Sequence, residues 1–164
     1  MAFDAFMKLD TIDGESSDDK HQKWIEVLSY SWGVNQTASA SSSSHGSLSS
    51  QRADFHDFSF VKALDAASPK IIMACASGEH LPSATMEICR AGGDKQPFME
   101  YKMTDVIVTG IRPGGSGSGE NLPLEEVSLN YGKIEWKYTQ TKVEGGKGSG
   151  SIPGGWDLKT NKKV

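Results

Sequence analysis

The sequence has little cysteine, no excess of basic charge and no long apolar run, and each shortage excludes a class of protein. Cys75 and Cys89 are its only cysteines in 164 residues, whereas a disulfide-stabilised fold of this size would carry more, so we expect two free thiols. The 17 Lys and Arg residues against 21 Asp and Glu residues give a net charge of −4, which argues against nucleic acid as a partner. No stretch approaches the roughly 20 apolar residues of a membrane-spanning helix, so we expect no membrane insertion.

Motifs for metal binding, nucleotide binding and covalent catalysis are also missing. None of the four histidines belongs to a CxxC or HExxH pattern of the kind found in zinc sites. The Gly-Lys pairs lack the first glycine and the Ser or Thr of a phosphate-binding loop, and no GxSxG sequence of a hydrolase occurs. A Ser–His–Asp triad stays compatible with the composition alone. We nevertheless expect no cofactor, no metal site and no catalytic residue, hence a protein that is not an enzyme.

Length and composition predict a single domain spanning residues 1–164. Apolar residues make up 37% of the chain without counting Gly, which suits one hydrophobic core. Three segments interrupt the pattern without resembling an interdomain linker: the Ser-rich loop 37–50 and the Gly-rich turns 110–119 and 145–155. The N-terminal residues have no basic segment followed by a continuous apolar one, so we expect no Sec signal peptide and folding in the cytosol.

Alternation of apolar and polar residues with a period of two dominates the sequence and predicts antiparallel β-strands. The expected strands are Phe3–Leu9, Trp24–Val34, Phe55–Val61, Ala84–Arg90, Pro97–Thr109, Leu124–Thr139 and Trp156–Lys159. Within Leu124–Thr139 the apolar parity switches at Gly132, as at a β-bulge. Pro97–Thr109 keeps one apolar parity from Met99 to Ile107.

One short helix is expected against this background. Ser68 suits the N-cap, Pro69 suits the first turn, and Gly78 suits the residue that ends the helix. One side of the helix carries Ile71, Ile72, Ala74, Cys75 and Ala76, so we expect Cys75 to face the core. The expected fold class is therefore mainly β, an antiparallel barrel-like architecture of two sheets with one short capping α-helix.

The second expected strand, Trp24–Val34, carries the candidate binding residues. Tyr30 and Trp32 lie on its bulky face. On its other face lie Ile25, Val27, Ser29, Ser31 and Gly33. A strand with one bulky and one small face fits a wall that lines a lumen or groove, with Ser29 and Ser31 turned toward it. The alternative, equally compatible with the sequence, is that the small face packs under a neighbouring loop.

Two polar runs contain histidine and acidic residues, and both are interpreted as surface. Asp54–Asp57 is typical of a solvated or interface strand, because it shows neither metal-ligand spacing nor a pattern of supporting residues. Asp18–His21 precedes a strand and is interpreted as a solvated turn rather than an acid–base pair.

Several short blocks, in their order and spacing, resemble the haemolysin-coregulated protein (Hcp) family of bacterial type VI secretion systems. The blocks are Met1–Leu9 with Gly14–Ser16, Ile25–Gly33, Phe58–Lys62, Ser68–Lys70 with Ala74–His80, Ala91–Gly93, Gly114–Gly117, Val127–Tyr131 and Gly155–Asp157. Each block is weak alone, but the set is specific, and the resemblance extends over nearly the whole chain.

The resemblance implies a tail-tube fold whose copies form hexameric rings, which stack into the inner tube of a contractile injection machine. It implies spike and sheath proteins and secreted effectors as partners, assembly in the bacterial cytoplasm, and export through the machine without a signal peptide. Ser29 and Ser31 would then face the lumen and contact effectors. Association between rings would involve the loop residues Ser39, Ser41, Ser42, Ser43, Ser44, His45 and Leu48.

The alternative function is that of a monomeric β-barrel or sandwich that binds a small ligand or a carbohydrate, and a hydrolase ranks third. Oligomeric state separates the first two hypotheses. A closed ring needs several copies of the chain, whereas a ligand-binding barrel needs one.

Overall fold

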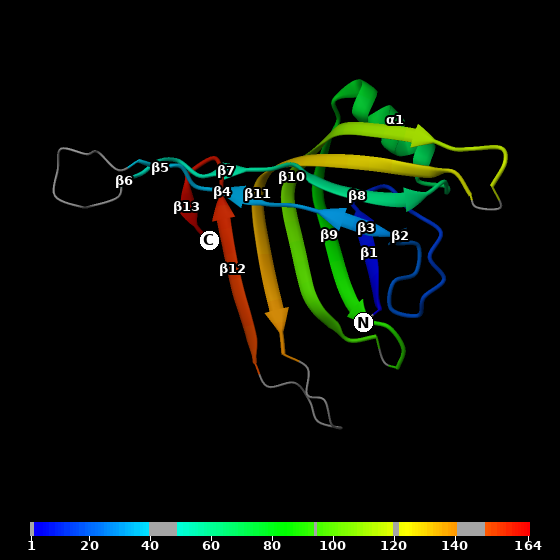
Figure 1. Ribbon diagram of the computed structural model, residues 1–164, viewed down its shortest axis with the longest axis horizontal. Coiled ribbons are helices and arrows are strands. Elements are labelled where there is room, and N and C mark those ends of the chain that lie inside the picture. Colours follow the sequence, from blue (N-terminus) through cyan, green and yellow to red (C-terminus); the bar gives the residue numbers. More distant parts are fainter. Residues whose placement is uncertain (1, 40–48, 94, 120–121, 141–149) are drawn as a thin grey trace.

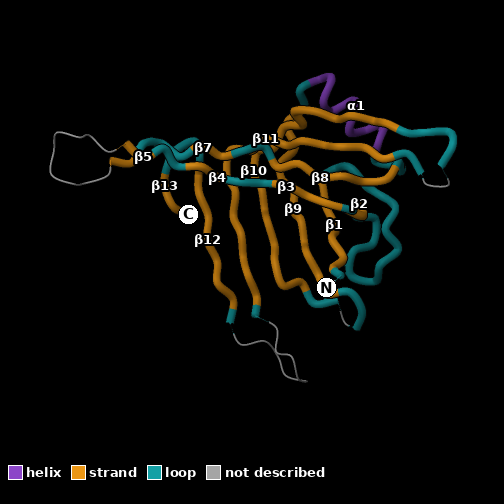
Figure 2. The backbone as a smooth tube through the Cα atoms, in the orientation of Figure 1, coloured by secondary structure: helices purple, strands orange, loops and turns teal. Residues whose placement is uncertain are grey.

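The computed structural model describes residues 2–39, 49–93, 95–119, 122–140 and 150–164, and its elements are almost all β-strands (Figures 1 and 2). The elements are β1 (Phe3–Leu9), β2 (Ile25–Val27), β3 (Ser29–Ser31), β4 (Val34–Asn35), β5 (Ala38–Ser39), β6 (Ser49–Ser50), β7 (Asp54–Phe55), β8 (Phe58–Ala63), α1 (Ser68–Ser77), β9 (His80–Arg90), β10 (Pro97–Gly114), β11 (Leu124–Thr139), β12 (Ser151–Asp157) and β13 (Lys162–Lys163). The expected strands at β1 and β11 are confirmed with the same bounds. The strand expected at Phe55–Val61 is divided between β7 and β8, and β9, β10 and β12 each begin or end beyond the expected residues.

The strands form two layers that share the two longest members. One layer contains β1, β9, the first half of β10, the second half of β11, and β12; the other contains β3, β8, the first half of β11 and the second half of β10. The hydrogen-bonded path closes on itself because β2 pairs with β1 and runs into β3 through Leu28, whose N–H donates to the Val61 carbonyl at 2.8 Å. The mainly β, antiparallel, barrel-like fold is therefore confirmed.

Both long strands turn a corner where they pass from one layer to the other. Asp105 of β10 lies opposite Gly132 of β11. Asp105 has a φ of 56°, in the left-handed region that Asp tolerates better than most residues. A Cβ atom at Gly132 would lie 2.8 Å from Cε of Lys159, so glycine leaves room for that side chain. The inward-facing parity changes at the corner, and Met103 and Val106 are both buried.

The sequence predicts the change of face at Gly132 but not its geometry. The pairing register is the same on both sides of Gly132, and the register shift of β10 lies instead between Val108 and Gly110. The single parity expected from Met99 to Ile107 is wrong, because Val108 and not Ile107 continues the buried face. A single Asp with a left-handed φ does not change the hydropathy pattern, so the sequence does not predict the change of face at Asp105.

The core lies between the two layers and is filled by large side chains. The fully buried residues include Met7, Leu9, Ile25, Phe58, Phe60, Leu81, Met86, Met103, Leu129 and Ile134. Helix α1 packs against β10 at one end of the barrel (Figure 1). The barrel is therefore a packed core rather than a container, so a ligand or partner has to bind on its outer faces.

Helix α1 ends where the sequence predicts, but its N-terminus differs. Pro69 lies in the first turn, and Gly78 caps the C-terminus with a left-handed φ of 67°. Ala67 and not Ser68 occupies the N-cap position, without a side-chain hydrogen bond, and Ser68 is buried. Of the residues expected on the core side, Ile71 and Ala74 are buried and Cys75 is half-buried, whereas Ile72 is 45% exposed and Ala76 is also exposed.

The second expected strand is broken into three. Leu28 separates β2 from β3 and is 57% exposed, and β4 follows. Because Leu28 interrupts the alternation, Ile25 and Val27 are buried while Ser29 and Ser31 are exposed. The expectation that all four residues share one face is wrong.

Three further expectations concern thiols, turns and membrane spans. Cys75 and Cys89 are both free, as expected; Cys89 is buried and Cys75 is half-buried against the core. The two Gly-rich turns are shorter than expected, because residues 110–114 belong to β10 and residues 151–155 belong to β12. In the described part of the chain, no helix combines the length and the apolar character that crossing a bilayer requires.

Candidate functional site

A row of small residues crosses the outer face of the layer formed by β3, β8, β11 and β10. Cross-strand pairing places Ser31 beside Ser59, Ser59 beside Ser128, and Ser128 beside Gly110. We call these four residues the hydroxyl row. They alternate along their strands with core residues such as Phe60, so the hydroxyl row points away from the core.

The hydroxyl row is partly accessible to solvent and consists of small residues. Ser31 is exposed, and the other three residues are half-buried. A Cβ atom at Gly110 would lie 3.2 Å from Oγ of Ser128, so a larger residue there would crowd the row. The arrangement presents three hydroxyl groups, each able to donate and to accept hydrogen bonds, with no charged group among them.

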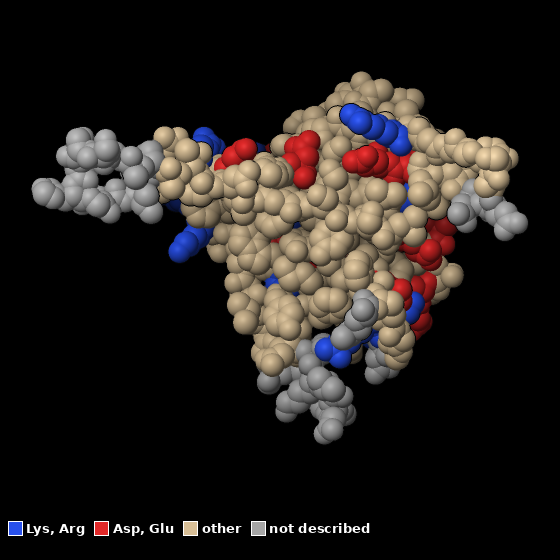
Figure 3. All heavy atoms as spheres, in the orientation of Figure 1, with Lys and Arg blue, Asp and Glu red and all other residues tan. Residues whose placement is uncertain are grey.

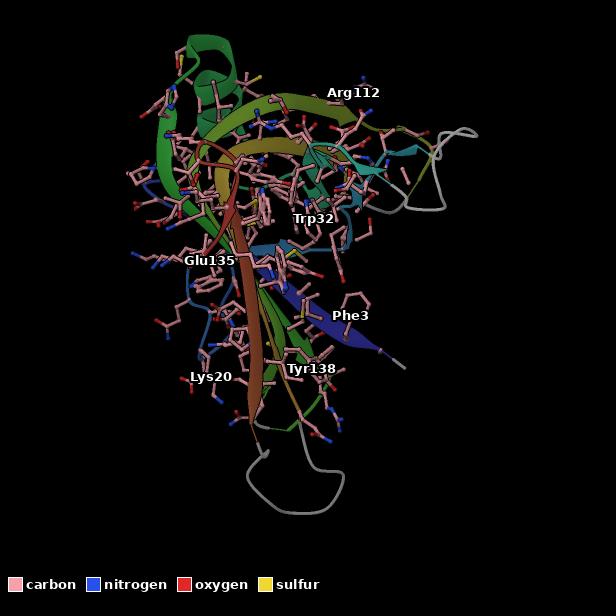
Figure 4. The ribbon with its side chains drawn as sticks, turned by 90° about the vertical axis from the view of Figure 1, so that its left-hand side faces the viewer. Phe3, Lys20, Trp32, Arg112, Glu135 and Tyr138 are labelled. Atoms are coloured by element: carbon pink, nitrogen blue, oxygen red, sulfur yellow. The ribbon has the colours of Figure 1, made fainter. Side chains whose placement is uncertain are left out.

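Charged residues lie beside the hydroxyl row rather than within it. Glu126 of β11 pairs with Arg112 of β10, and both side chains are exposed. In Figure 4 Arg112 lies on the opposite side of the ribbon from Glu135 of the other layer. Figure 3 shows a face of the molecule on which uncharged residues predominate, with Asp and Glu gathered toward its upper part and right-hand edge. The outer faces of the two layers therefore point in different directions and carry different side chains.

The other side of the hydroxyl row is bordered by a fixed carboxylate. Asp57 accepts hydrogen bonds from Oγ1 of Thr109 at 2.7 Å and from Nδ2 of Asn130 at 2.9 Å. His56 faces elsewhere, with its Nε2 2.9 Å from Nδ2 of Asn35. The polar residues of Asp54–Asp57 therefore act separately at the surface, in line with the interpretation of this run as solvated.

Aromatic residues anchor β3 from beneath. Tyr30 stacks on Phe58 with ring centroids 6.1 Å apart. Trp32 Nε1 donates to Tyr131 Oη at 2.5 Å, and Tyr131 donates in turn to the His56 carbonyl at 2.7 Å. Burial raises the pKa of Tyr131 to about 12, so the phenol stays a donor at neutral pH. These contacts hold the outward-facing side chains of β3 in a fixed position.

Sequence reasoning found one end of the hydroxyl row and missed the rest. Ser29 and Ser31 lie exposed on the face opposite Tyr30. The sequence does not predict that Ser59 and Ser128 lie beside Ser31, because only the pairing between strands distant in sequence brings them together. The signal was present in the alternation of β8 and β11, where each serine is flanked by buried apolar residues.

The loop residues expected to join rings are only partly described. Ser39 belongs to β5, whose backbone pairs with β6 away from the barrel (Figure 1). The residues that lie outside the described part of the chain are Ser41, Ser42, Ser43, Ser44, His45 and Leu48.

The expectation that Asp18–His21 is a solvated turn is confirmed for Asp19 and Lys20, which are exposed in a turn, and is wrong for His21. His21 is 1% exposed, and its Nδ1 and Nε2 lie 2.6 Å from carboxylate oxygens of Asp18 and Glu87 respectively. Lys95 Nζ lies 2.9 Å from Asp18. Hydrogen bonds from His21 and Lys95 lower the pKa of Asp18 to about 2. His21 and Asp18 are turned inward because they have partners, remote in sequence, on β9 and in the turn that follows it.

Comparison with known proteins agrees with this architecture. A family model described as "Type VI secretion system effector, Hcp" matches residues 6–138. Protein hcp1 of Pseudomonas aeruginosa is 36% identical over 162 residues, 98% of each chain. A solved structure described as a type six secretion system protein is 40% identical, covers 99% of this chain and 100% of its own, and has a TM-score of 0.93. Hcp1 from Salmonella typhimurium is 35% identical, with the same coverage and a TM-score of 0.80. The chain therefore belongs to the Hcp family of type VI secretion proteins.

Proposed function

We propose that this chain acts as one domain, a tube subunit that closes into hexameric rings whose lumen is lined by the hydroxyl row and carries effectors. Membership of the Hcp family supports the role in type VI secretion. The observation that carries the finer proposal is the hydroxyl row itself, a small, uncharged and hydrogen-bonding surface on a continuous sheet. Such a surface leaves space for cargo and suits varied polar partners.

Two unpaired strand edges support closure into a ring. β3 pairs with β8, and residues 108–114 of β10 pair with β11, with no second strand partner for either edge among the described residues. Because this layer has four antiparallel strands, its two edges run in opposite directions. An identical neighbour can therefore set its β3 against this β10 in antiparallel pairing. Repetition of that contact closes a ring and leaves no free edge; the number six comes from the family resemblance.

The outer face of the other layer supports the assignment of the lumen by contrast. Glu100 pairs across strands with Lys137, and Lys102 pairs with Glu135. This pattern of alternating charges is typical of a solvated surface. The uncharged hydroxyl row is the better candidate for a surface that has to accommodate different cargo without strong electrostatic preference.

The loop 37–50 is our candidate for end-to-end association of rings, and hence for the stacked tube. Its flanks, β5 and β6, pair with each other and project from the barrel (Figure 1). Replacing the loop by a Gly-Ser connector should preserve the ring and weaken stacking, observed by electron microscopy. Loss of folding would show instead that the loop contributes to the core. Spike, sheath and effectors are the partners that this role entails, with assembly in the cytoplasm followed by export.

Ser31→Gln tests the proposed lumen. The longer side chain should leave the melting temperature and the ring mass by native mass spectrometry unchanged, and should abolish co-purification of effectors. Ser151→Gln, on the exposed start of β12, is the matched control and should keep effector binding. A stable Ser31→Gln ring that still binds effectors would place the cargo site elsewhere. Destabilisation by about 1–3 kcal/mol would show that Ser31 is packed against a neighbour. A wild-type mass of only 17.7 kDa would overturn the ring.

A further inference from the structure

We propose that His21, Glu87 and Cys89 form a binding site for a divalent transition-metal ion of the zinc type. One nitrogen, one oxygen and one sulfur ligand atom of these residues all lie within 4.8 Å of one another. His21 Nε2 is 2.6 Å from Glu87 Oε2 and 4.0 Å from Cys89 Sγ. Imidazole, carboxylate and thiolate together are ligands that zinc favours over calcium or magnesium.

The fold brings these ligands together on rigid elements. Glu87 and Cys89 are two residues apart on β9, so their side chains leave the same face of the sheet. His21 lies against that face, stacked on Phe6 with ring centroids 4.2 Å apart and edge-on to Trp24 at 4.8 Å. A ring clamped between two aromatic side chains has little freedom to turn, which lowers the cost of binding an ion.

A second carboxylate orients the histidine as metal sites require. Asp18 lies 2.6 Å from His21 Nδ1, which directs Nε2 toward Glu87 and Cys89. Histidine ligands in metalloproteins usually donate their other ring N–H to a carboxylate in this manner. Asp18 is itself held by Lys95 at 2.9 Å. The cluster therefore contains three candidate ligands and a supporting residue for the histidine.

Charge and access also favour a cation. Asp4, Asp18 and Glu26 line a hollow of about 400 Å³ in which Lys95 is the single cation among the lining residues. The hollow adjoins the cluster through Asp18, the partner of His21, and the three candidate ligands do not line it. Glu87 is 19% exposed, whereas His21 and Cys89 are buried. The ion can therefore approach from the Glu87 side and keep a water molecule as its fourth ligand, as in open zinc sites.

The movement needed to admit the ion is small. Tetrahedral bonds of about 2.0–2.3 Å put the nitrogen roughly 3.4 Å from the oxygen and about 3.6 Å from the sulfur. The observed 2.6 Å and 4.0 Å separations thus have to change by less than about 1 Å each. On binding, the Cys89 thiol proton and the proton shared by His21 and Glu87 pass to solvent, and the ion takes their place. No oxidation or reduction is involved.

Cobalt and zinc titrations of the untagged, chelator-treated full-length protein test the site. We expect Co²⁺ to give a thiolate-to-cobalt charge-transfer band, and Zn²⁺ to displace it at one ion per chain. Cys89→Ser should lose the band, and Glu87→Gln should weaken binding at least about tenfold. Cys75→Ser, which removes the other thiol, should behave as wild type.

Two results would overturn the proposal. One is the absence of the charge-transfer band and of retained zinc in the wild-type protein, which would leave the cluster as a hydrogen-bonded structural contact. The other is equal loss of the band in Cys75→Ser. Circular dichroism and ring mass of each variant confirm that it is folded, and Glu87→Gln preserves the shape of the side chain, so a loss of affinity there is not a loss of fold.

Discussion

Two lysines of this protein pair with carboxylates in opposite surroundings. Lys62 is fully buried, with Nζ 3.0 Å from Glu125, 2.9 Å from Asp65 and 2.8 Å from Ser68 Oγ. Lys159 is 66% exposed and pairs with Asp105 at the corner of the long strands. The first cluster joins the start of α1 to β8 and β11, whereas the second lies on the surface over a turn in the backbone. The two clusters contain similar groups, but we expect their contributions to the free energy of unfolding to differ strongly.

Burial is what separates the two clusters. An exposed ion pair gains little, since water and salt screen it and its long side chains lose freedom. A buried pair costs free energy to form, because both charges lose their hydration. Removing one partner costs more still, because the other charge then stays buried without hydration or a counter-charge. Glu125 already has one carboxylate oxygen, Oε2, that is buried without a hydrogen-bond partner in the described structure. If Glu125 loses Lys62, no other donor in the described structure is placed to replace it.

Lys62→Met should have the largest effect on stability. It leaves Glu125 and Ser68 buried without their cation, and the free energy of unfolding should fall by about 3–5 kcal/mol. Chemical denaturation at one fixed protein concentration measures this loss, because ring assembly makes stability depend on concentration. The double change Lys62→Met with Glu125→Leu should recover most of it, since both charges are then removed together.

Lys159→Met is the matched control for that experiment. It removes a lysine that also pairs with a carboxylate, and we expect the melting temperature to change by at most about 2 °C. Equal effects of the two single substitutions would contradict the distinction between the buried and the exposed cluster. Failure of the double variant to recover stability would show that Lys62 acts through packing rather than charge.

Ser68→Ala should have the next largest effect. Ser68 Oγ accepts from Lys62 Nζ at 2.8 Å and from the Asp65 backbone N–H at 3.1 Å, and it also bonds to Glu125. Its loss leaves buried polar groups short of a partner and should cost about 1–3 kcal/mol. Thermal unfolding measures the change. Ser77→Ala, at the exposed end of α1, should be close to neutral, and a similar loss there would indicate that the helix and not the cluster is affected.

The sequence predicts well what is local and poorly what depends on distant partners. Alternation correctly predicts β1 and β11, and Gly78 marks the end of α1, because each signal lies within one segment. Ser68 is a residue type that is common at N-caps, but here its hydroxyl is buried and accepts a hydrogen bond from Lys62. His21 similarly has the local sequence of a solvated turn and is buried by Glu87 of β9. Burial of a charged residue depends on pairing that a single segment does not encode.

The same reasoning separates the found and missed parts of the candidate site. Ser29 and Ser31 follow from alternation opposite Tyr30. Ser128 and Gly110 follow only from the register of β8, β11 and β10, which shifts between Val108 and Gly110. Periodicity predicts the fold class, whereas the surface formed by the hydroxyl row can be identified only when the pairing between strands is known.

Asp105→Gly and Asp105→Ala should differ in a way that isolates the backbone at the corner. Both lose the pair with Lys159, but only glycine adopts the φ of 56° without steric cost. We expect the alanine variant to melt about 2–4 °C below the glycine variant. Equal melting temperatures would indicate that the corner relaxes to an ordinary φ when the Asp is removed.

The smallest expected effect is the pH dependence of the exposed cluster. Hydrogen bonds from Lys159 and His80 lower the pKa of Asp105. A carboxyl group whose pKa is lower in the folded state stabilises the fold above its unfolded pKa, near 4, and loses that contribution as the pH falls through the folded value. The difference in melting temperature between wild type and Asp105→Asn, which keeps a residue tolerant of positive φ, should therefore be positive at pH 6 and decrease steadily as the pH falls below 4. Asp18, whose pKa is also lowered, is present in both proteins and cancels from the difference. Salt at 1 M should reduce the difference at pH 6, because the pair is exposed to solvent. A difference that stays constant between pH 6 and pH 3 would mean that Asp105 acts through its backbone conformation and not through its charge.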